Sequence, residues 1–391
     1  MVHYDVVYVG IPHDLKVRLV QHRQQKILVI DDKTMYQYHQ GLSFNHPKVE
    51  MLYHISKDLE PDEQISFEDR AAFFEQVVLN YEQKAQENKL EQRDDLAQKE
   101  VDFKSGKVEL IGNQQLRLSW LDRVEEISYN EVYLVKKDYR TLDRSNPFVY
   151  TFGDLIHFQE LPKSVVIEMD SLQALEVAYL WASYGSQVSL LITKNSLQEV
   201  ESLYFRDGIR DRLAEFGIEF YPLAQQIKLQ DKHQYLEVTF ISMNQPKSLL
   251  AEVYFVAGTE VDFSAYYGNT EASMIIDENA VPYFEIHLNP AFVQVGKADK
   301  ENDLIIQKEA SQLTYFYSNF DFKGGIELSF NKKTQQFNAG TFYCRDAHSI
   351  ADSFQLIKQQ KLSLVDLAHA TNSSSIFSIF KEFAVAILEE V

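Results

Sequence analysis

Apolar and polar residues near the start of the chain follow a strand–helix–strand order. Tyr4–Val9 is a mainly apolar run, as expected for a strand that is covered on both faces. Asp14–Arg23 has apolar residues at helical spacing, and Ile27–Ile30 is a second short apolar run. The pattern predicts a βαβ unit with a tight turn that begins at Gly10.

The same order recurs at Lys163–Thr193, where a strand, a turn, a helix and a second strand follow one another. Gly185 lies between that helix and the second strand, where the C-terminal cap of a helix is expected. Strands predicted at Gly217–Tyr221, Leu236–Ile241 and Val253–Val256 continue the unit. The chain is therefore expected to contain two α/β units.

Between the two units the pattern is first irregular, over Met35–Glu63, and then helical. The long helix is predicted to begin at Ser66, which has capping-box spacing with Asp69. Beyond Glu82 this helix becomes polar, which predicts a solvated face; a helix that docks a partner is the alternative. Short alternating runs then predict an antiparallel meander, at Val108–Ile111, Leu116–Trp120, Glu125–Ser128 and Val132–Val135.

From Val281 onward the pattern changes to strands that are followed by helices. Strands are predicted at Gly325–Phe330 and Phe337–Cys344, and helices at His348–Gln359 and Ile376–Glu389. This order predicts a third region of the α+β type.

Composition and charge narrow the possible functions. The chain has 391 residues, of which 45% are hydrophobic, enough for two or three domains. Its net charge of -20 argues against nucleic acid and anionic membranes as partners. We expect neither a transmembrane helix nor a signal peptide. Cys344 is the only cysteine, which excludes a disulfide within the chain and fits a reducing cytoplasm.

The first turn, VGIPHDL, differs from a dinucleotide-binding GxGxxG turn at the positions that contact phosphate. Such a turn lets the backbone approach the pyrophosphate and directs the amides of a helix N-terminus at it. Only Gly10 is retained; Pro12 and Leu15 occupy the other glycine positions. Asp14 lies at the predicted helix start, where it is expected to cap the amides and to occupy the anion site itself.

The second turn, in VVIEMDSLQAL, has the same differences. Met169 and Ser171 stand at glycine positions, while Ala174 is acceptable at the third. Glu168 and Asp170 bring negative charge, and two like charges about 4 Å apart repel by roughly 4 kcal/mol at an effective dielectric constant near 20. We therefore expect both turns to disfavour a pyrophosphate. Asp170, like Asp14, is interpreted as a helix cap.

The ordered series resembles the pyridine nucleotide-disulphide oxidoreductases, the family of dihydrolipoamide dehydrogenase and glutathione reductase. The matching segments are YDVVYVG, ELPKSVVI, GSQVSLL, VPYFEIHLNPAFVQVG, GGIELSFNKKT and AHSIADSFQLIKQQKLSLVDLA. The resemblance implies an α/β fold with two Rossmann-like domains, of the FAD- and NAD(P)-binding types, and a C-terminal α+β interface domain that forms a homodimer. The corresponding bounds are 1–153, with 260–280 as a candidate addition, 154–259, and 281–391.

The resemblance also indicates which residues would contact a cofactor. Gly10 begins the first turn, Asp31 follows the second strand where a ribose-binding acid is expected, and Glu176 lies on the helix of the second unit. We interpret all three as vestigial contacts. No cofactor is expected, although FAD or NAD(P) stays open as the alternative.

The chain departs from the family at the residues that perform the chemistry. The family's two redox cysteines have no counterpart in Lys33–Val49, and Ser373–Phe380 stands where the family has its proton-handling His and Glu. Lys136 and Lys137 stand where the family has a strand end that contacts the flavin. A later segment that contacts the flavin in the family has no counterpart in this chain. With a single thiol, a dithiol–disulfide cycle cannot run within one subunit. We expect Cys344 to be buried and inert.

Two functions follow from this combination. The first is a dimeric binding, scaffold or regulatory protein without disulphide reductase activity, with no catalytic residues and an unknown protein partner. The alternative is an FAD- or NAD(P)H-dependent oxidoreductase with an altered cofactor mode. No metal site is expected, because the spacing of His39, His46 and His54 fits no metal-binding pattern. Dimerisation is predicted through one side of the last helix, formed by Ile376, Phe380, Phe383 and Ile387.

Overall fold

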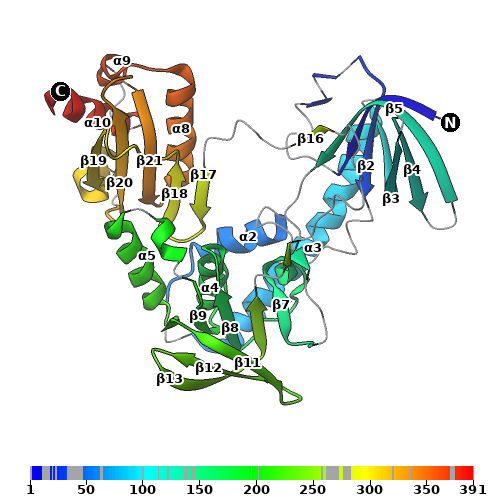
Figure 1. The fold of residues 1–391 in the computed structure, drawn as a ribbon, viewed down its shortest axis with the longest axis horizontal. Helices are drawn as coiled ribbons and strands as arrows, with labels where there is room; N and C mark the ends of the chain where they lie inside the picture. The colour runs from blue at the N-terminus through cyan, green and yellow to red at the C-terminus, as the bar shows by residue number, and fades with distance from the viewer. Residues whose placement is uncertain are drawn as a thin grey trace.

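The structure is a computed structural model of the whole chain. It describes residues 2–10, 18–19, 21–22, 24–32, 47–61, 65–98, 101–112, 114–120, 123–135, 140–141, 146–194, 196–200, 202–256, 259–260, 273–275, 283–318, 321–334, 336–369 and 375–390. The elements form three groups: a sheet near the N-terminus, a central α/β unit and a C-terminal domain (Figure 1).

The N-terminal sheet is a ring of five strands with a sixth strand at its side. The strands are β1 (Val2–Val9), β2 (Ile27–Asp32), β3 (Asp102–Gly112), β4 (Gln115–Trp120), β5 (Arg123–Val135) and β16 (Ser273–Ile275). β1 pairs in parallel with β2 and β5, and the antiparallel β3–β4–β5 meander completes the ring. β16 pairs in parallel with β5, so the chain returns to this sheet late in the sequence.

Two of the predicted strands in the meander are one element. Glu125–Ser128 and Val132–Val135 both belong to β5, whose first half pairs with β4 and whose second half pairs with β1. The polar residues between them do not interrupt the strand, because β5 changes partners there while its backbone stays hydrogen-bonded. The short pair β6 (Arg140–Thr141) and β15 (Thr259–Glu260) lies outside the ring.

The central unit is a parallel sheet with the order β10–β9–β8–β14–β7. Its strands are β7 (Val149–Thr151), β8 (Ser164–Met169), β9 (Gln187–Ile192), β10 (Glu219–Pro222) and β14 (Val253–Val256). Helices α4 (Gln173–Ser183) and α5 (Leu203–Glu215) pack on one face. The antiparallel strands β11 (Gln225–Asp231), β12 (Leu236–Ser242) and β13 (Gln245–Ala251) pack on the other face. Two short 3-10 helices, η2 (Phe152–His157) and η3 (Ser196–Glu199), connect these elements.

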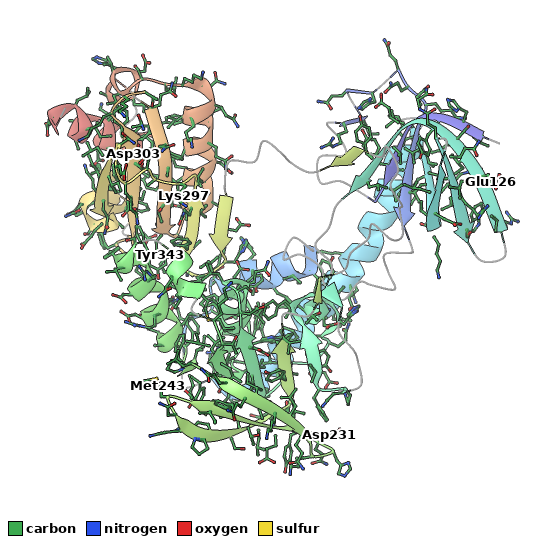
Figure 2. The ribbon with its side chains drawn as sticks, viewed as in Figure 1. Glu126, Asp231, Met243, Lys297, Asp303 and Tyr343 are labelled. Atoms are coloured by element: carbon green, nitrogen blue, oxygen red, sulfur yellow. The ribbon has the colours of Figure 1, made fainter. Side chains whose placement is uncertain are left out.

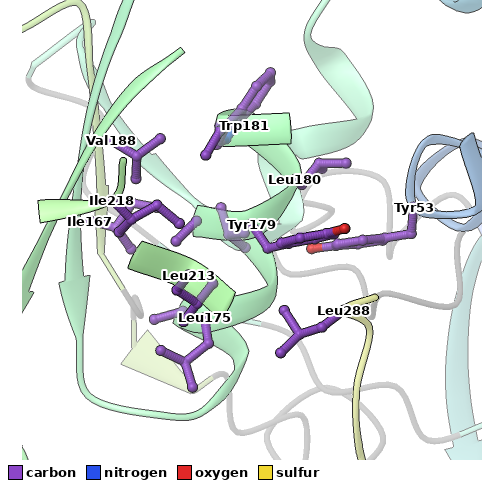
Figure 3. Packing of buried hydrophobic residues seen from close by; sticks show 14 of the residues in the cluster. Tyr53, Ile167, Leu175, Tyr179, Leu180, Trp181, Val188, Leu213, Ile218 and Leu288 are labelled. Atoms are coloured by element: carbon purple, nitrogen blue, oxygen red, sulfur yellow. The ribbon is translucent and has the colours of Figure 1, made fainter. Parts of the chain in front are cut away.

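Helix α4 is buried from its second residue to its last, and most of its residues are apolar. All residues from Ala174 to Ser183 are buried, including Tyr179 and Trp181. Figure 3 shows Tyr53 and Leu288 meeting this helix from outside the central sheet. A helix that is apolar on all sides must be covered on all sides, and other parts of the chain supply the cover.

Part of that cover comes from the segment that precedes the meander. Helix α2 (Pro47–Ser56) and the long helix α3 (Phe67–Gln98) place Leu52, Tyr53 and Phe74 in the core of the central unit. The prediction of an irregular Met35–Glu63 was wrong for α2, whose apolar residues recur at helical spacing over too short a stretch to be recognised. The cap predicted at Ser66 is confirmed, because the Asp69 N–H donates to the Ser66 hydroxyl oxygen at 3.1 Å and that hydroxyl donates to the Asp69 carboxylate at 2.7 Å. Side chains beyond Lys84 on α3 lie outside the described set, so its solvated face stays a prediction.

The C-terminal domain is an antiparallel sheet covered by helices. The sheet order is β17 (Tyr283–Ile286), β18 (Ala291–Val295), β21 (Gln336–Cys344), β20 (Gly325–Asn331) and β19 (Asp303–Glu309). The helices are α7 (Thr314–Ser318), α8 (Ala347–Gln360), α9 (Leu364–Ala368) and α10 (Phe377–Glu390), with the 3-10 helix η4 (Ala310–Gln312). This arrangement matches the strands and helices predicted after Val281.

The prediction that Ile376, Phe380, Phe383 and Ile387 on the last helix form a dimer face is wrong. Phe380, Phe383 and Ile387 are fully buried in the core of their own domain, and Ile376 packs against that core. An apolar stripe on a helix shows only that the stripe is covered. Here the sheet and α8 of the same chain cover it.

The C-terminal domain is held against the central unit by specific contacts. The hydroxyl of Tyr343 donates to the carbonyl of Gly208 on α5 at 2.9 Å, and Figure 2 shows Tyr343 at this boundary. Tyr204 donates to the carbonyl of Gly324 at 3.2 Å. Arg212, which is buried, binds both carboxylate oxygens of Glu60 and the carbonyl of Asn289.

None of the described helices has the length and apolar character needed to cross a membrane.

Candidate functional site

The first turn is described only at its two strand ends. Gly10 follows β1 with a φ of 94°, and its N–H donates to the carbonyl of Ile30 at 2.9 Å. Asp31 is in β2, opposite Ser105 of β3. Because β1 and β2 are parallel, Gly10 and Asp31 both lie at the carboxyl ends of these strands, the end at which parallel strands of α/β folds bind ligands. Pro12, Asp14 and Leu15 lie outside the described residues, so the predicted cap at Asp14 stays a prediction.

The second turn, between β8 and α4, is closed by the chain that follows β9. Met169 is fully buried at the first glycine position. Its carbonyl accepts hydrogen bonds from the N–H groups of Thr193 and Lys194, both at 3.3 Å, and from the Thr193 hydroxyl at 3.0 Å. The backbone at this point therefore bonds to other protein groups.

Negative charge lies in the same turn. Glu168 is half-buried and accepts a hydrogen bond from the Tyr254 hydroxyl at 3.0 Å. Burial, opposed by that hydrogen bond and assisted by the charge of Asp170, raises the pKa of Glu168 above its ordinary value. A pyrophosphate placed here would meet two carboxyl groups and a methionine where glycines are needed. The residues of the second turn do not fit an NAD(P) pyrophosphate.

The interpretation of Asp170 as a helix cap is wrong. Helix α4 begins after Leu172, which makes no side-chain capping bond. The chain makes a turn first, in which the N–H of Ala174 bonds to the carbonyl of Ser171 at 3.3 Å. The helix therefore starts later than the position of the acid suggested. Gly185, with a φ of 103°, follows the last helical residues as expected.

Glu176, the third predicted contact, faces the C-terminal domain. Its side chain is only 4% exposed, and its Oε1 accepts hydrogen bonds from the backbone N–H of His287 at 2.6 Å and from Nδ1 of His287 at 2.8 Å. This pair joins α4 of the central unit to the residue that follows β17. Cofactor contact by Gly10, Asp31 and Glu176 stays a prediction.

Two further residues complete a cluster around His287. The imidazole of His348, on the first turn of α8, stacks on that of His287 with ring centres 5.1 Å apart. Glu285 Oε2 lies 3.2 Å from His348 Nδ1, and Glu285 Oε1 lies 3.8 Å from His287 Nε2. The ring of Tyr53, on α2, covers His287 at 5.5 Å. The cluster thus lies where α2, α4, β17 and α8 meet.

The charge on His287 is set by opposing effects. Burial disfavours its protonated form, but the hydrogen bond and the charge of Glu176, with the charge of Glu285, more than offset this and raise the pKa of His287. Burial, followed by the charge of Glu176, raises the pKa of Tyr53 well above its ordinary value. A carboxylate–imidazole pair therefore lies at the centre of the cluster, beneath a neutral phenol.

This cluster could not be predicted from the sequence pattern. Glu285 and His287 are two residues apart on a strand end, which would place them on one face and was the only available signal. His348 is distant in the sequence and is brought close by the fold. Of the histidines between the two units, His54 is exposed on α2, while His39 and His46 lie outside the described residues.

Cys344 is buried at the end of β21, as predicted. Burial, followed by the charges of Asp346 and Asp321, raises the pKa of its thiol well above the ordinary value. A thiol in such surroundings is a poor nucleophile, because the reactive form is the thiolate.

A hollow of about 350 Å³ lies on the central unit, lined by Tyr150, His157, Phe158, Pro162 and Glu252. These residues lie near the starts of β8 and β14, at the amino ends of the parallel strands. Ligands of open α/β sheets bind at the carboxyl ends. The hollow therefore does not coincide with either turn.

Comparisons with known proteins agree on the architecture. No protein-family model matches the sequence, and no curated protein sequence matches it. Among solved structures, the HOCl-induced flavoprotein disulfide reductase RclA from Escherichia coli superposes with a TM-score of 0.74 and 14% identity, covering 96% of this chain and 99% of that one. A Cu(II) complex of RclA gives a TM-score of 0.75 at 14% identity, covering 98% and 100%.

LpdA from Mycobacterium tuberculosis superposes with a TM-score of 0.77 and 12% identity, covering 99% of this chain and 100% of that one. At sequence identities this low, the superpositions establish the fold and not the chemistry. The expected arrangement of two Rossmann-like domains and a C-terminal interface-type domain is present over the whole length. The chain has the fold of the flavoprotein disulfide reductases, and the resemblance to pyridine nucleotide-disulphide oxidoreductases that its sequence indicated is confirmed at the level of that fold.

Proposed function

We propose that this protein is a dimeric binding, scaffold or regulatory protein that uses the flavoprotein disulfide reductase fold without reducing disulfides. The observation that carries the proposal is the single thiol of the chain. Cys344 is fully buried in the C-terminal sheet, and its pKa is raised. Disulfide exchange needs an accessible thiolate and a second thiol to resolve the mixed disulfide, and one subunit has neither.

The second turn supports the same proposal. The buried Met169 and the carboxyl groups of Glu168 and Asp170 oppose binding of a nicotinamide dinucleotide at this turn. A reductase of this fold would need that dinucleotide as its source of electrons. The division into domains at 1–153, 154–259 and 281–391, with 260–280 as an addition to the first, stays part of the proposal. Pairing of β16 with β5 supports the addition, whereas α2 and α3 pack on the central unit.

Dimerisation through the C-terminal domain is proposed on a different surface from the one first expected. The exposed apolar side chains of α9 and α10 are Val365, Val385 and Leu388, which are 53%, 40% and 45% exposed. Helices α9 and α10 are in contact, and exposed apolar side chains on adjoining helices favour association.

The single cysteine and the acidic net charge support a location in a reducing cytoplasm, with neither nucleic acid nor membrane as a partner.

The proposal is tested by measuring disulfide reduction with the full-length protein. Purified protein is incubated with NADH or NADPH and a low-molecular-weight disulfide, with RclA from Escherichia coli assayed in parallel as the active reference. We expect no turnover above the rate without protein. Turnover at a rate comparable to that of the reference would overturn the proposal.

The alternative function is an FAD- or NAD(P)H-dependent oxidoreductase without a redox disulfide. It is favoured by Gly10, whose positive φ is retained at the end of β1 beside Asp31 at the end of β2. An absorbance scan of gently purified protein discriminates between the two. A flavin spectrum at one flavin per chain would favour the alternative, whereas its absence, together with no thermal shift in FAD, NADH or NADPH, would favour the binding protein.

A further inference from the structure

We propose that Glu285, His287 and His348 bind one divalent transition-metal cation of the Zn²⁺ type at the junction between the central unit and the C-terminal domain. Ligand-capable atoms of the three side chains all lie within 4.8 Å of one another. The site is separate from both turns and does not depend on the proposed function. In Figure 1, β17 points from the C-terminal domain toward α2 and α4. Glu285 lies in β17, His287 follows that strand, and His348 lies on α8.

The distances are close to those of a coordination shell. Zn²⁺ binds imidazole nitrogen and carboxylate oxygen at about 2.0–2.2 Å, so neighbouring ligand atoms in a tetrahedral site are roughly 3–3.5 Å apart. Glu285 Oε2 lies 3.2 Å from His348 Nδ1, and Glu285 Oε1 lies 3.8 Å from His287 Nε2. Small rotations of the side chains would therefore bring all three ligand atoms onto one cation.

Glu176 provides the outer contact that metal-binding histidines usually have. A coordinating imidazole commonly donates its other N–H to a carboxylate, which fixes the tautomer and the ring orientation. His287 Nδ1 makes this bond with the buried Glu176 at 2.8 Å, which directs Nε2 toward Glu285. The backbone N–H of His287 donates to the same oxygen at 2.6 Å, so the position of the ring is held twice.

His348 is free to present a lone pair. Its Nε2 is buried and has no hydrogen-bond partner among the described residues. No second hydrogen bond of the described chain therefore fixes which nitrogen carries the proton, and Nδ1 can face a cation.

The ligand set indicates the class of metal. Two imidazoles and one carboxylate suit Zn²⁺ and related transition metals, whereas Ca²⁺ and Mg²⁺ prefer sites made of oxygen alone. Three protein ligands leave at least one position for water or another ligand. Through the Glu176–His287 pair, a bound cation would also strengthen the connection between α4 and the C-terminal domain.

The test is isothermal titration of Zn²⁺ into tag-free, full-length protein that has been treated with a chelator. We expect one Zn²⁺ per chain, no competition by Mg²⁺, and visible d–d absorption when Co²⁺ is used instead. His348→Ala and Glu285→Gln should abolish stoichiometric binding. Glu176→Gln, which alters only the outer contact, should weaken binding by about 10–100-fold.

The matched control is His369→Ala, because His369 is an exposed histidine of the same domain outside the cluster. Its binding should equal that of the unaltered protein. Circular dichroism of each metal-free variant verifies folding, and His348 is suited to this test because its side chain is 28% exposed. No saturable Zn²⁺ binding by the unaltered protein, or equal binding by folded His348→Ala and His369→Ala, would overturn the proposal.

Discussion

At the scale of single residues, the second turn shows how an acid can be retained where it is disfavoured. Glu168 lies one residue before the end of the buried strand β8, and the Tyr254 hydroxyl partly offsets the effects of burial and of Asp170 on its charged form. Because the pKa of Glu168 is raised, the native protein holds this proton more tightly than the unfolded chain does. The ionised Glu168 therefore destabilises the native protein. This destabilisation is absent at pH values below the ordinary glutamate pKa of about 4.3, and it is complete at pH values above the raised pKa of Glu168.

Replacing Glu168 with glutamine should remove that destabilisation. Glu168→Gln retains an oxygen that can accept the Tyr254 hydrogen bond, so we expect a higher melting temperature at pH 8. The gain should decrease as the pH falls and disappear near pH 4, where the native carboxyl is protonated. Thermal unfolding across this pH range measures both effects.

Glu131→Gln is the control for this prediction, because Glu131 is exposed and also accepts a hydrogen bond from a tyrosine hydroxyl, that of Tyr133. It should change the melting temperature little at any pH. A Glu168→Gln variant that is no more stable than the unaltered protein at pH 8 would contradict the physical account of the turn.

At the scale of elements, the start of β20 depends on a glycine. Gly324 has a φ of 88°, and a Cβ at this position would lie 1.7 Å from the carbonyl oxygen of Tyr343 on β21. Gly217, after α5, has a φ of 71° but nothing within 4 Å of its Cβ position. The two glycines therefore share the same backbone requirement and differ in the available space.

This pair gives a matched test of close packing between strands. Gly217→Ala should lower the free energy of unfolding by about 1–2 kcal/mol through the left-handed conformation alone. Gly324→Ala should lower it by on the order of 2–3 kcal/mol more, because β20 must move away from β21. Denaturant unfolding of both variants measures the difference, and equal losses would show that the close approach is unimportant.

The last helix, α10, has two apolar sides with different roles. Phe383 is fully buried in the domain core, while Leu388 is 45% exposed. Phe383→Ala should lower the free energy of unfolding by about 3–5 kcal/mol, because it leaves a cavity. Leu388→Ala, measured at protein concentrations low enough for the chain to be monomeric, should change it by less than about 0.5 kcal/mol. Denaturant unfolding tests the assignment, and a reversed order would show that the helix is rotated from its described position.

At the scale of the whole molecule, the exposed side of α9 and α10 should control assembly. We expect the protein to sediment as a dimer at micromolar concentration. The double variant Val365→Glu, Leu388→Glu should sediment as a monomer, because it places like charges across an apolar contact. Leu203→Glu on α5, where Leu203 is 67% exposed, is the matched control and should stay dimeric. A dimeric double variant would move the interface elsewhere.

Much of the local structure was predictable because it follows from nearby residues. The helix cap at Ser66, the turn at Gly185 and the buried thiol of Cys344 all depend on short-range chemistry and on local apolar character. The cap assigned to Asp170 failed because the position of an acid does not determine where a helix begins. Helix α2 was missed because its apolar period covers few residues.

The sequence by itself determined the paired strands of both units and the helix of the second, the substitutions in their glycine turns and the presence of one thiol, because these depend on residue identity and on local periodicity. The helix predicted at Asp14–Arg23 lies mostly outside the described residues and stays a prediction. Only the tertiary structure decided that α2 and α3 cover the central unit, that α10 turns its phenylalanines inward, that Glu176 reaches His287, and that His348 stacks on His287. The physical reason is that apolar burial is non-directional. A stripe or a charged residue shows that a partner is needed, but the path of the whole chain determines which partner it meets.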